Sequence, residues 1–299
     1  MQKLLNQLAP LEPIATDIQV NDAPLQNIKV VLFDIYGTLM ISACGDVGSI
    51  DFKGDVAWQA LKKAGFTMGN ACDELEIGRL ALQEFNKTVM SVHQKEKQLG
   101  NQYPEIVITE IWQKVVNVLL KQSKIIAPTS DIDFNYIAFL FECLTNPVYP
   151  MPNMQYVLDK LAPKFALGIV SNAQFFTPIF MNYFLDDKNY LQHKYIKGFE
   201  DKYTSYSYEY KTAKPGTDIF KSIIPALRKD GFTNENILFI GNDMLNDIVP
   251  ANQVGFKTVL FAGDKRSLRL RKEDKRVKNI VPDRVIINLK QILNILGVQ

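Results

Sequence analysis

Four groups of polar residues in this sequence could do chemistry, because each lies beside a short apolar segment or a predicted helix. The first group follows "VVLF" and the last follows "ILFIG", and both segments are typical of buried strands. The residues concerned are Asp34, then Ser171 and Asn172, then Lys214, and finally Asn242, Asp243 and Asp247. If they converged in one pocket, they would supply it with carboxylates, small hydrogen-bond donors and one ammonium group.

The elements that must position these residues alternate between strand and helix. The runs "IKVVLF", "FALGIV", "NILFIG" and "KTVLF" lack a polar alternation and predict strands buried on both faces. Helical patterns separate the later strands, so the sequence predicts an α/β fold with a doubly wound parallel sheet. In such sheets binding sites lie at the carboxyl ends of the strands, where the polar residues are expected.

Residues 51–145 have a different pattern, with apolar positions three and four residues apart and few strand candidates. We expect about four helices here, one of them opened by Pro104 and carrying a core-forming stripe. The stripe is Ile108, Trp112, Val115 and Leu119. The predicted organisation is an N-terminal extension (1–24), an α/β core (25–41 and 148–299) and an inserted α-helical cap domain (42–147).

Each polar group alone has an ordinary structural explanation. An aspartate at a strand end often caps a helix, Ser-Asn pairs are common in turns, and proline after Lys214 suits the first position of a helix. The order of all four groups along one chain is more informative than any single group.

As a set, the groups resemble the motifs of the haloacid dehalogenase (HAD) superfamily of hydrolases. That family has a D-x-[DY]-G-T loop, a Ser or Thr after a later strand, a Lys before a helix and a pair of acids. Here "DIYGT", Ser171, Lys214 and the pair Asp243 and Asp247 match in that order. One subclass carries its cap between the first and second motifs, as residues 42–147 would be here. The resemblance implies a hydrolase with a Rossmann-type core that acts on a small molecule.

The resemblance also implies a role for each matching residue. Asp34 would be the nucleophile and would form an aspartyl intermediate that water hydrolyses. Ser171 and the backbone N–H of Asn172 would hold the transferring group, while Lys214 would offset charge near Asp34. The residues expected to contact the substrate are Tyr36, Gly37, Thr38, Asn172 and Lys214.

The phosphatases of this family bind Mg²⁺, so the resemblance implies a magnesium site. Its ligands would be Asp34, the backbone carbonyl of Tyr36 and Asp243, and such oxygen ligands suit the ion. Asp247 would have a catalytic supporting role, either orienting a metal-bound water or reaching Lys214.

Tyr36 departs from the phosphatase pattern, in which the residue two after the nucleophile is usually an aspartate that protonates the leaving group. Positioned acid-base catalysis contributes about 10²- to 10⁴-fold, and a phenol with a reference pKa near 10 is a poor substitute at neutral pH. Tyr36 therefore predicts substrates whose leaving group departs without a proton.

Three functions remain open on this sequence. Mg²⁺-dependent hydrolysis of a small phosphorylated metabolite is the first. Dehalogenase-type hydrolysis of a carbon–halogen bond is the second, because the haloacid dehalogenases carry D-x-Y-G-T. Against it, "SACGDVGSIDFKGD" lacks the arginine that those enzymes carry soon after the first motif, and "GNDMLND" keeps two acids four positions apart. The third is a non-catalytic HAD-like binding protein, since a fold does not fix a function.

Composition gives weaker constraints on partners and location. The 299 residues are 47% hydrophobic and 22% charged, with a net charge of +2, so neither nucleic acid nor a membrane is an expected partner. The three cysteines are widely separated and the N-terminal residues are too polar for a secretory segment, which favours the cytoplasm. The basic run from Asp264 to Lys278 is expected to be a solvated face or a flap. The oligomeric state is left open.

Overall fold

A computed structural model of the protein describes residues 1–44, 54–70 and 73–298. The chain forms two compact units: Met1–Leu8 with Asp46–Pro147, and Ala9–Gly45 with Val148–Gln299. We call them the helical unit and the α/β unit. All of the candidate site residues belong to the α/β unit.

Within its described residues, the helical unit contains four long helices. They form a common core in which Trp112 packs against Phe85 and Phe141, with ring centroids 5.5 and 4.9 Å apart. The stripe expected from the sequence is buried in this core. The helices are α2 (Gly54–Lys63), α3 (Glu74–Gln98), α4 (Ile108–Lys121) and α5 (Phe134–Thr145). Pro104 does not open α4, which begins four residues later behind Val107.

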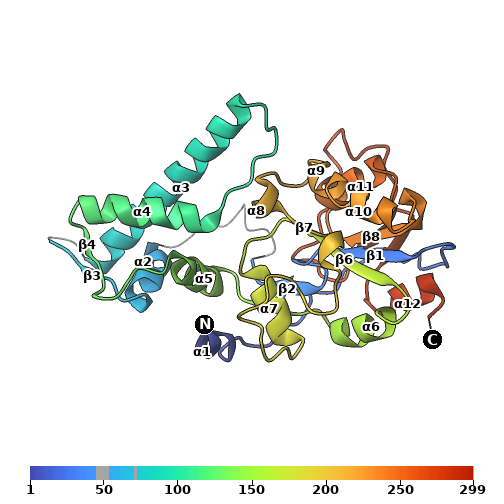
Figure 1. The fold of residues 1–299 in the computed structure, drawn as a ribbon, viewed down its shortest axis with the longest axis horizontal. Helices are drawn as coiled ribbons and strands as arrows, with labels where there is room; N and C mark the ends of the chain where they lie inside the picture. Colours follow the sequence, from blue (N-terminus) through green and yellow to red (C-terminus); the bar gives the residue numbers. More distant parts are fainter. Residues whose placement is uncertain (45–53, 71–72, 299) are drawn as a thin grey trace. The chain divides into compact units, whose positions relative to one another are not determined.

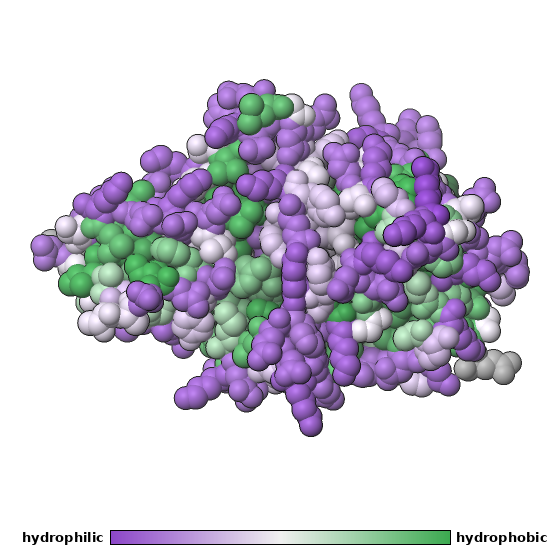
Figure 2. Space-filling view, in the orientation of Figure 1, coloured by the Kyte–Doolittle hydropathy of each residue, from purple (hydrophilic) through white to green (hydrophobic). Residues whose placement is uncertain are grey.

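A short pair of strands in the helical unit was not expected from the sequence. β3 (Thr67–Met68) and β4 (Ile125–Ile126) pair antiparallel. Figure 2 shows apolar residues gathered where these strands lie on an otherwise mostly hydrophilic face, and Met68 and Ile126 are 44% and 55% exposed. Across the ranges that the structure describes, no helix has the length and apolar character needed to span a membrane.

A parallel six-stranded sheet forms the centre of the α/β unit, as the sequence predicts for this fold class. Its strand order is β10-β9-β8-β1-β6-β7, and the strands of its middle are buried along their length because both faces are covered. The strands are β1 (Val30–Phe33), β6 (Ala166–Ser171), β7 (Thr204–Tyr206), β8 (Ile237–Gly241), β9 (Lys257–Phe261) and β10 (Arg284–Ile286).

Helices cover both faces of this sheet (Figure 1). On one face lie α6 (Met154–Leu161) and α12 (Gln291–Leu296), which contact each other. On the other face, apolar residues of three short helices pack against β1, β6 and β8. These helices are α9 (Asp218–Lys221), α10 (Ile224–Lys229) and α11 (Val249–Gln253).

Several remaining elements connect this sheet to the rest of the unit. β2 (Met40–Ser42) and β5 (Val148–Pro150) pair antiparallel where the chain leaves and re-enters the α/β unit. α7 (Thr177–Phe184) follows β6, and α8 (Ser207–Tyr210) follows β7. Three further turns of helix are η2 (Asp201–Tyr203), η3 (Asn234–Asn236) and the π-helix η4 (Met244–Ile248).

Residues 216–231 contain two short helices, α9 and α10, and no continuous one. Pro225 lies in the first turn of α10, where the missing N–H of proline interrupts a continuous hydrogen-bond ladder. Residues 186–210 are rich in tyrosine and contain β7, whose three residues are too few to show a period in the sequence.

The N-terminal residues do not form one separate extension. α1 (Gln2–Leu5) belongs to the helical unit. Residues 9–24 run along the surface of the α/β unit, where Ile14 N donates to Asp264 and Asn21 pairs with Val285 of β10. These contacts extend the sheet edge by one antiparallel bridge.

Candidate active site

Asp34 stands directly after β1, at the carboxyl edge of the sheet. Its backbone N–H donates to the carbonyl of Ile240 in the adjacent β8, at 2.9 Å. The loop that follows turns sharply, because the Ile35 carbonyl accepts the N–H groups of Thr38, Leu39 and Met40. The sheet therefore fixes the backbone of Asp34, and a tight turn carries the chain away from it.

Gly37 is required in this turn for two reasons. Its φ of +84° lies in the left-handed region, which disfavours residues with a Cβ. A Cβ at this position would also lie 2.6 Å from both Asn242 Nδ2 and Ser267 Cβ. The first motif thus packs directly against the chain after β8.

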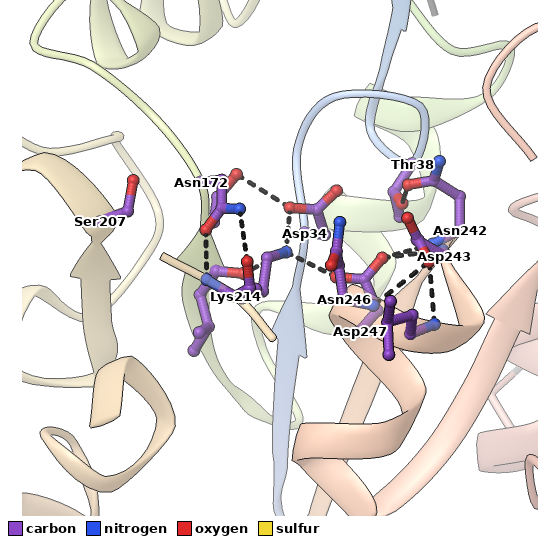
Figure 3. A network of polar contacts seen from close by, with 12 residues as sticks. Asp34, Thr38, Asn172, Ser207, Lys214, Asn242, Asp243, Asn246 and Asp247 are labelled. Carbon is purple, nitrogen blue, oxygen red and sulfur yellow. Dashed lines mark hydrogen bonds and ion pairs between the residues drawn. The ribbon is translucent and has the colours of Figure 1, made fainter. Parts of the chain in front are cut away.

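Lys214 joins the two buried carboxylates of the site. Its Nζ donates to Asp34 Oδ1 at 2.7 Å and to Asp247 Oδ1 at 2.5 Å, as Figure 3 shows. Ser171 Oγ donates to the same oxygen of Asp34, at 2.9 Å. Lys214 and Asp34 are each 6% exposed, Asp247 is 1% exposed and Ser171 is fully buried. Residues from four distant parts of the sequence therefore meet around one ammonium group.

The backbone of Lys214 is held by the side chain of Asn172. Lys214 N donates to Asn172 Oδ1 at 2.8 Å, and Asn172 Nδ2 donates back to the Lys214 carbonyl at 3.3 Å. The Lys214 ammonium also donates to the carbonyl of Val170, at 3.3 Å. Lys214 points inward although Pro215 does not open a helix, since α9 begins only at Asp218.

Asp247 reaches the site from the π-helix η4. Its Oδ2 accepts the backbone N–H groups of Asn242 and Asp243, both at 2.9 Å, and its Oδ1 accepts from Lys214. This close approach requires Gly241, because a Cβ there would lie 2.4 Å from Asp247 Cγ. The carboxylate thus closes the turn after β8 and pairs with the lysine.

Electrostatics reinforce this pairing. Burial alone would lower the pKa of Lys214, but the carboxylates of Asp247 and Asp34 raise it above its ordinary value. Burial raises the pKa of Asp247 to about 7, and the Lys214 ammonium acts in the opposite direction. Because Asp247 also accepts two backbone N–H groups, its ionised form is the better satisfied one. Lys214 therefore carries its charge at neutral pH between two carboxylates.

Tyr36 and Thr38 both use their hydroxyl groups within the α/β unit. The hydroxyl of Tyr36 lies 2.9 Å from Thr177 Oγ1 at the start of α7. Thr38 Oγ1 donates to Asn242 Oδ1 at 3.2 Å, and Asn242 Nδ2 donates to the Ser267 carbonyl at 2.6 Å. Thr38 and Asn242 thereby connect the first motif to the segment beyond β9.

Asp243, the expected magnesium ligand, is bound by the protein itself. Its Oδ1 accepts the backbone N–H groups of Leu245 and Asn246, at 2.8 and 3.2 Å, and so caps η4. Arg271 donates to both of its oxygens, through Nε at 3.3 and 3.2 Å and through Nη2 at 2.7 Å. Asp243 therefore forms a bidentate ion pair rather than an open coordination site.

These residues do not fit a Mg²⁺ ion as they lie. Both oxygens of Asp243 and both oxygens of Asp247 already accept hydrogen bonds, and Oδ1 of Asp34 accepts two. Among the residues that the structure describes, no three aspartate, glutamate, histidine or cysteine side chains are grouped so that they could hold a metal ion. Mg²⁺ demands near-octahedral oxygen coordination, which this donor set does not offer.

Two contributions to the site were not expected from the sequence. The side chain of Asn172 was overlooked because only its backbone was assigned a role. Arg271 was overlooked because it belongs to the basic run from Asp264 to Lys278, which resembles a solvated face. The sequence did contain one indication that this run is partly buried, because Leu268 and Leu270 alternate with arginines. Both leucines pack against the apolar cluster around η4 and β9.

Comparisons with known proteins agree with this architecture. Residues 211–292, which contain Lys214, Asp247 and Arg271, match the model of the family described as HAD-hydrolase-like. No curated protein matches this chain significantly.

Two solved structures share the fold along most of the chain. One is a 2-haloacid dehalogenase from Pseudomonas syringae, with 19% identity, a TM-score of 0.52 and coverage of 90% of this chain and 98% of that chain. The other is a HAD phosphatase from Thermococcus onnurineus, with 18% identity, a TM-score of 0.50 and the same coverage. At these identities the likeness concerns the fold. The chain therefore has the fold of these HAD-like proteins, and its residues 211–292 are similar to the HAD-hydrolase-like family.

Proposed function

We propose that the protein is a hydrolase in which Asp34 attacks its substrate covalently, and that the substrate is a small phosphorylated molecule. One observation carries the proposal: Asp34 is buried at the carboxyl edge of the sheet with Oδ1 bound by Lys214 and Ser171. Within the described part of the chain its Oδ2 accepts no hydrogen bond. One oxygen is thus oriented by two donors while the other is available for attack.

The reaction would proceed in two displacements. An oxygen of Asp34 bonds to phosphorus while the bond to the leaving oxygen breaks, and the leaving group keeps the electron pair. Water then attacks phosphorus in the aspartyl phosphate, releasing phosphate and a proton and restoring Asp34. Lys214 compensates negative charge beside the nucleophile in both steps, and Ser171 keeps the carboxylate in position. No step uses a metal ion, because the residues do not fit one.

The leaving group is constrained by Tyr36. Its hydroxyl contacts Thr177, and a phenol is a weak proton donor compared with a carboxylic acid. We therefore propose acyl or aryl phosphates, whose leaving groups have low pKa values, or substrates that carry their own proton donor. The variant Tyr36→Asp should raise the turnover of alkyl phosphates by at least about 10-fold more than that of aryl phosphates. Equal gains for both classes would contradict the explanation.

Carbon–halogen hydrolysis is the second candidate, and two observations favour it. Tyr36 suits a halide, which leaves without a proton, and both oxygens of Asp243 accept hydrogen bonds from Arg271. In that reaction Asp34 would bond to carbon while the halide departs, and water would then hydrolyse the resulting ester. The absence of an arginine between residues 42 and 55 speaks against it.

A paired screen of the purified protein tests both candidates. Phosphate release from a broad phosphoester panel and halide release from short 2-halo acids are measured, each with Mg²⁺ and with EDTA. Phosphate release that Asp34→Asn lowers by about 10³-fold or more would support the proposal. Turnover that survives Asp34→Asn would exclude this residue as the nucleophile, and release of halide alone would establish the second candidate.

A further inference from the structure

The strongest observation that the proposed function does not use is the pair of Arg271 and Asp243. The guanidinium group binds both carboxylate oxygens, and Asp243 is only 6% exposed. Planar bidentate pairs of this kind are geometrically specific. Arg271 thus lies against the carboxylate for which the family resemblance implies a divalent cation.

Arg271 is delivered to this position by an anchored segment. Arg269 N donates to the carbonyl of Asn242 at 3.1 Å, and Met244 N donates to the carbonyl of Arg269 at 2.8 Å. The chain of Arg269 therefore runs parallel to that of Asp243 in a β-bridge, two residues before Arg271. The backbone around Asp243 is paired with the same segment that supplies its cation.

Apolar packing holds the other side of that segment. Leu268 and Leu270 pack against the cluster of Met244, Leu245 and Ile248, while Ser267 is 1% exposed and accepts from Asn242 through its carbonyl. Arg271 has a φ of +49°, a left-handed conformation that a non-glycine residue keeps where its surroundings fix it. The guanidinium is therefore held in place from several directions.

We propose that Arg271 is the resident cation at Asp243 and that it excludes divalent metal ions from this carboxylate. A metal ion would have to displace a guanidinium bound through three contacts and would gain an oxygen that also caps η4. The remaining acid of this turn, Asp247, is bound through both oxygens. The positive charge at Asp243 is thus supplied by the protein itself, and this holds for phosphoester hydrolysis and for carbon–halogen hydrolysis alike.

The test measures Mg²⁺ binding by thermal unfolding of the full-length protein without substrate. Melting curves are recorded in EDTA and in about 10 mM MgCl₂ for the wild type and Arg271→Ala. Arg276→Ala is the matched control, because Arg276 is exposed, lies in the same segment and pairs with Asp274 instead. We expect Mg²⁺ to shift the Tm of the wild type and the control by less than about 1 °C and that of Arg271→Ala upward by at least about 3 °C.

A third variant locates the new binding site. Adding Asp243→Asn to Arg271→Ala should abolish the gained shift, because the uncovered carboxylate is gone. A wild type that Mg²⁺ stabilises as much as Arg271→Ala would overturn the proposal. So would an Arg271→Ala protein that Mg²⁺ leaves unchanged.

The variant Arg271→Gln covers the case in which Arg271→Ala does not fold. Arg271→Gln keeps part of the side chain and a neutral donor, and the same Mg²⁺ response is expected from it. Isothermal titration of the wild type with MgCl₂ provides an independent measurement, in which saturable binding that Asp243→Asn removes would contradict the proposal. None of these assays uses a substrate, so a result that contradicts the role of Arg271 says nothing about Asp34 as the nucleophile. Likewise, a screen that finds no phosphate or halide release says nothing about the role of Arg271.

Discussion

The α/β unit and the helical unit each bury a carboxylate, but they treat it differently. Asp247 in the α/β unit is 1% exposed and Glu142 in α5 is 9% exposed, and burial raises the pKa of each to about 7. Asp247 lies 2.5 Å from the Lys214 ammonium and accepts two backbone N–H groups. The side-chain carboxylate of Glu142 accepts only from the amide of Asn146, at 2.9 Å, among the described residues.

The difference shows where this protein keeps charge in its interior. A buried carboxylate without a cation is better satisfied when protonated, whereas one beside an ammonium can remain ionised. The helical unit therefore holds an acid that is close to neutral, and the α/β unit holds an ion-paired network around Asp34. Charge is retained at the carboxyl edge of the sheet, where covalent chemistry at Asp34 would need it.

The largest effect is expected from breaking the charged network. Lys214→Met keeps much of the side-chain volume but leaves Asp34 and Asp247 without a cation. Removing one partner of a buried ion pair costs about 3–5 kcal/mol, so we expect the free energy of unfolding to fall by that amount. Denaturant unfolding of the two proteins measures it. Lys211→Met is the control, because Lys211 is exposed three residues away, and it should change stability by less than about 0.5 kcal/mol.

A small loss for Lys214→Met, comparable to that of the control, would show that the network contributes little to stability. It would then matter only for positioning Asp34. A normal free energy of unfolding with lost turnover would separate these two roles.

The unpaired carboxylate gives the next largest effect, and its sign depends on pH. The pKa of Glu142 is about 7 in the folded protein against about 4.5 when unfolded, so the folded state binds the proton more tightly. Stability is therefore full below about pH 4.5 and falls as the pH rises through 7. Glu142→Gln stays neutral, keeps an oxygen for Asn146, and should be more stable than the wild type by up to about 3 kcal/mol above pH 8.

The same variant should have no advantage near pH 4, where Glu142 is protonated in both states. Unfolding curves of the two proteins across this pH range provide the test. Glu110→Gln, at an exposed position of the helical unit, should show no such trend. A gain for Glu142→Gln that is independent of pH would mean that packing, and not ionisation, distinguishes the two side chains.

A smaller effect is expected where the backbone makes room for the ionised carboxylate. Gly241→Ala would place a Cβ 2.4 Å from Asp247 Cγ, so the carboxylate or the turn after β8 must move. Overpacking of this kind costs about 1–3 kcal/mol. We expect that loss in denaturant unfolding together with lower turnover, because Asp247 would no longer meet Lys214. An unchanged free energy of unfolding would show that Asp247 has alternative positions.

The sequence predicts some strands of the α/β unit and not others. The strand runs β1, β8 and β9 are continuous and apolar, so the central sheet and the strand-end position of Asp34 were predictable. The two edge strands β7 and β10 were not, because three residues each show no period. Neither strand has a continuous apolar sequence, since β7 is Thr-Ser-Tyr and β10 is Arg-Val-Ile.

The site shows the same division between what composition reveals and what only the tertiary structure decides. Lys214 was predictable because its place in an ordered set of motifs gave it a role. Glu142 was not, since one acid in an otherwise apolar helix pattern does not reveal which way it faces. Arg271 was not, because its partner Asp243 lies 28 positions away on another segment and a charge run resembles a solvated surface.

The smallest effect on stability is expected from the ion pair of Arg271 and Asp243. Its degree of charge compensation is intermediate between that of Asp247, which is paired with Lys214, and that of Glu142, which accepts from an amide. The Arg271 side chain is 33% exposed, so water screens this pair far more than it screens Lys214. A double-mutant cycle with Arg271→Ala and Asp243→Asn should give a coupling free energy of about 1 kcal/mol in EDTA, falling as KCl is added. The coupling between Lys214 and Asp247 should instead be larger and nearly independent of salt, because both groups are buried. If both couplings had the same size and salt dependence, burial could not be the property that separates the paired charges of this unit.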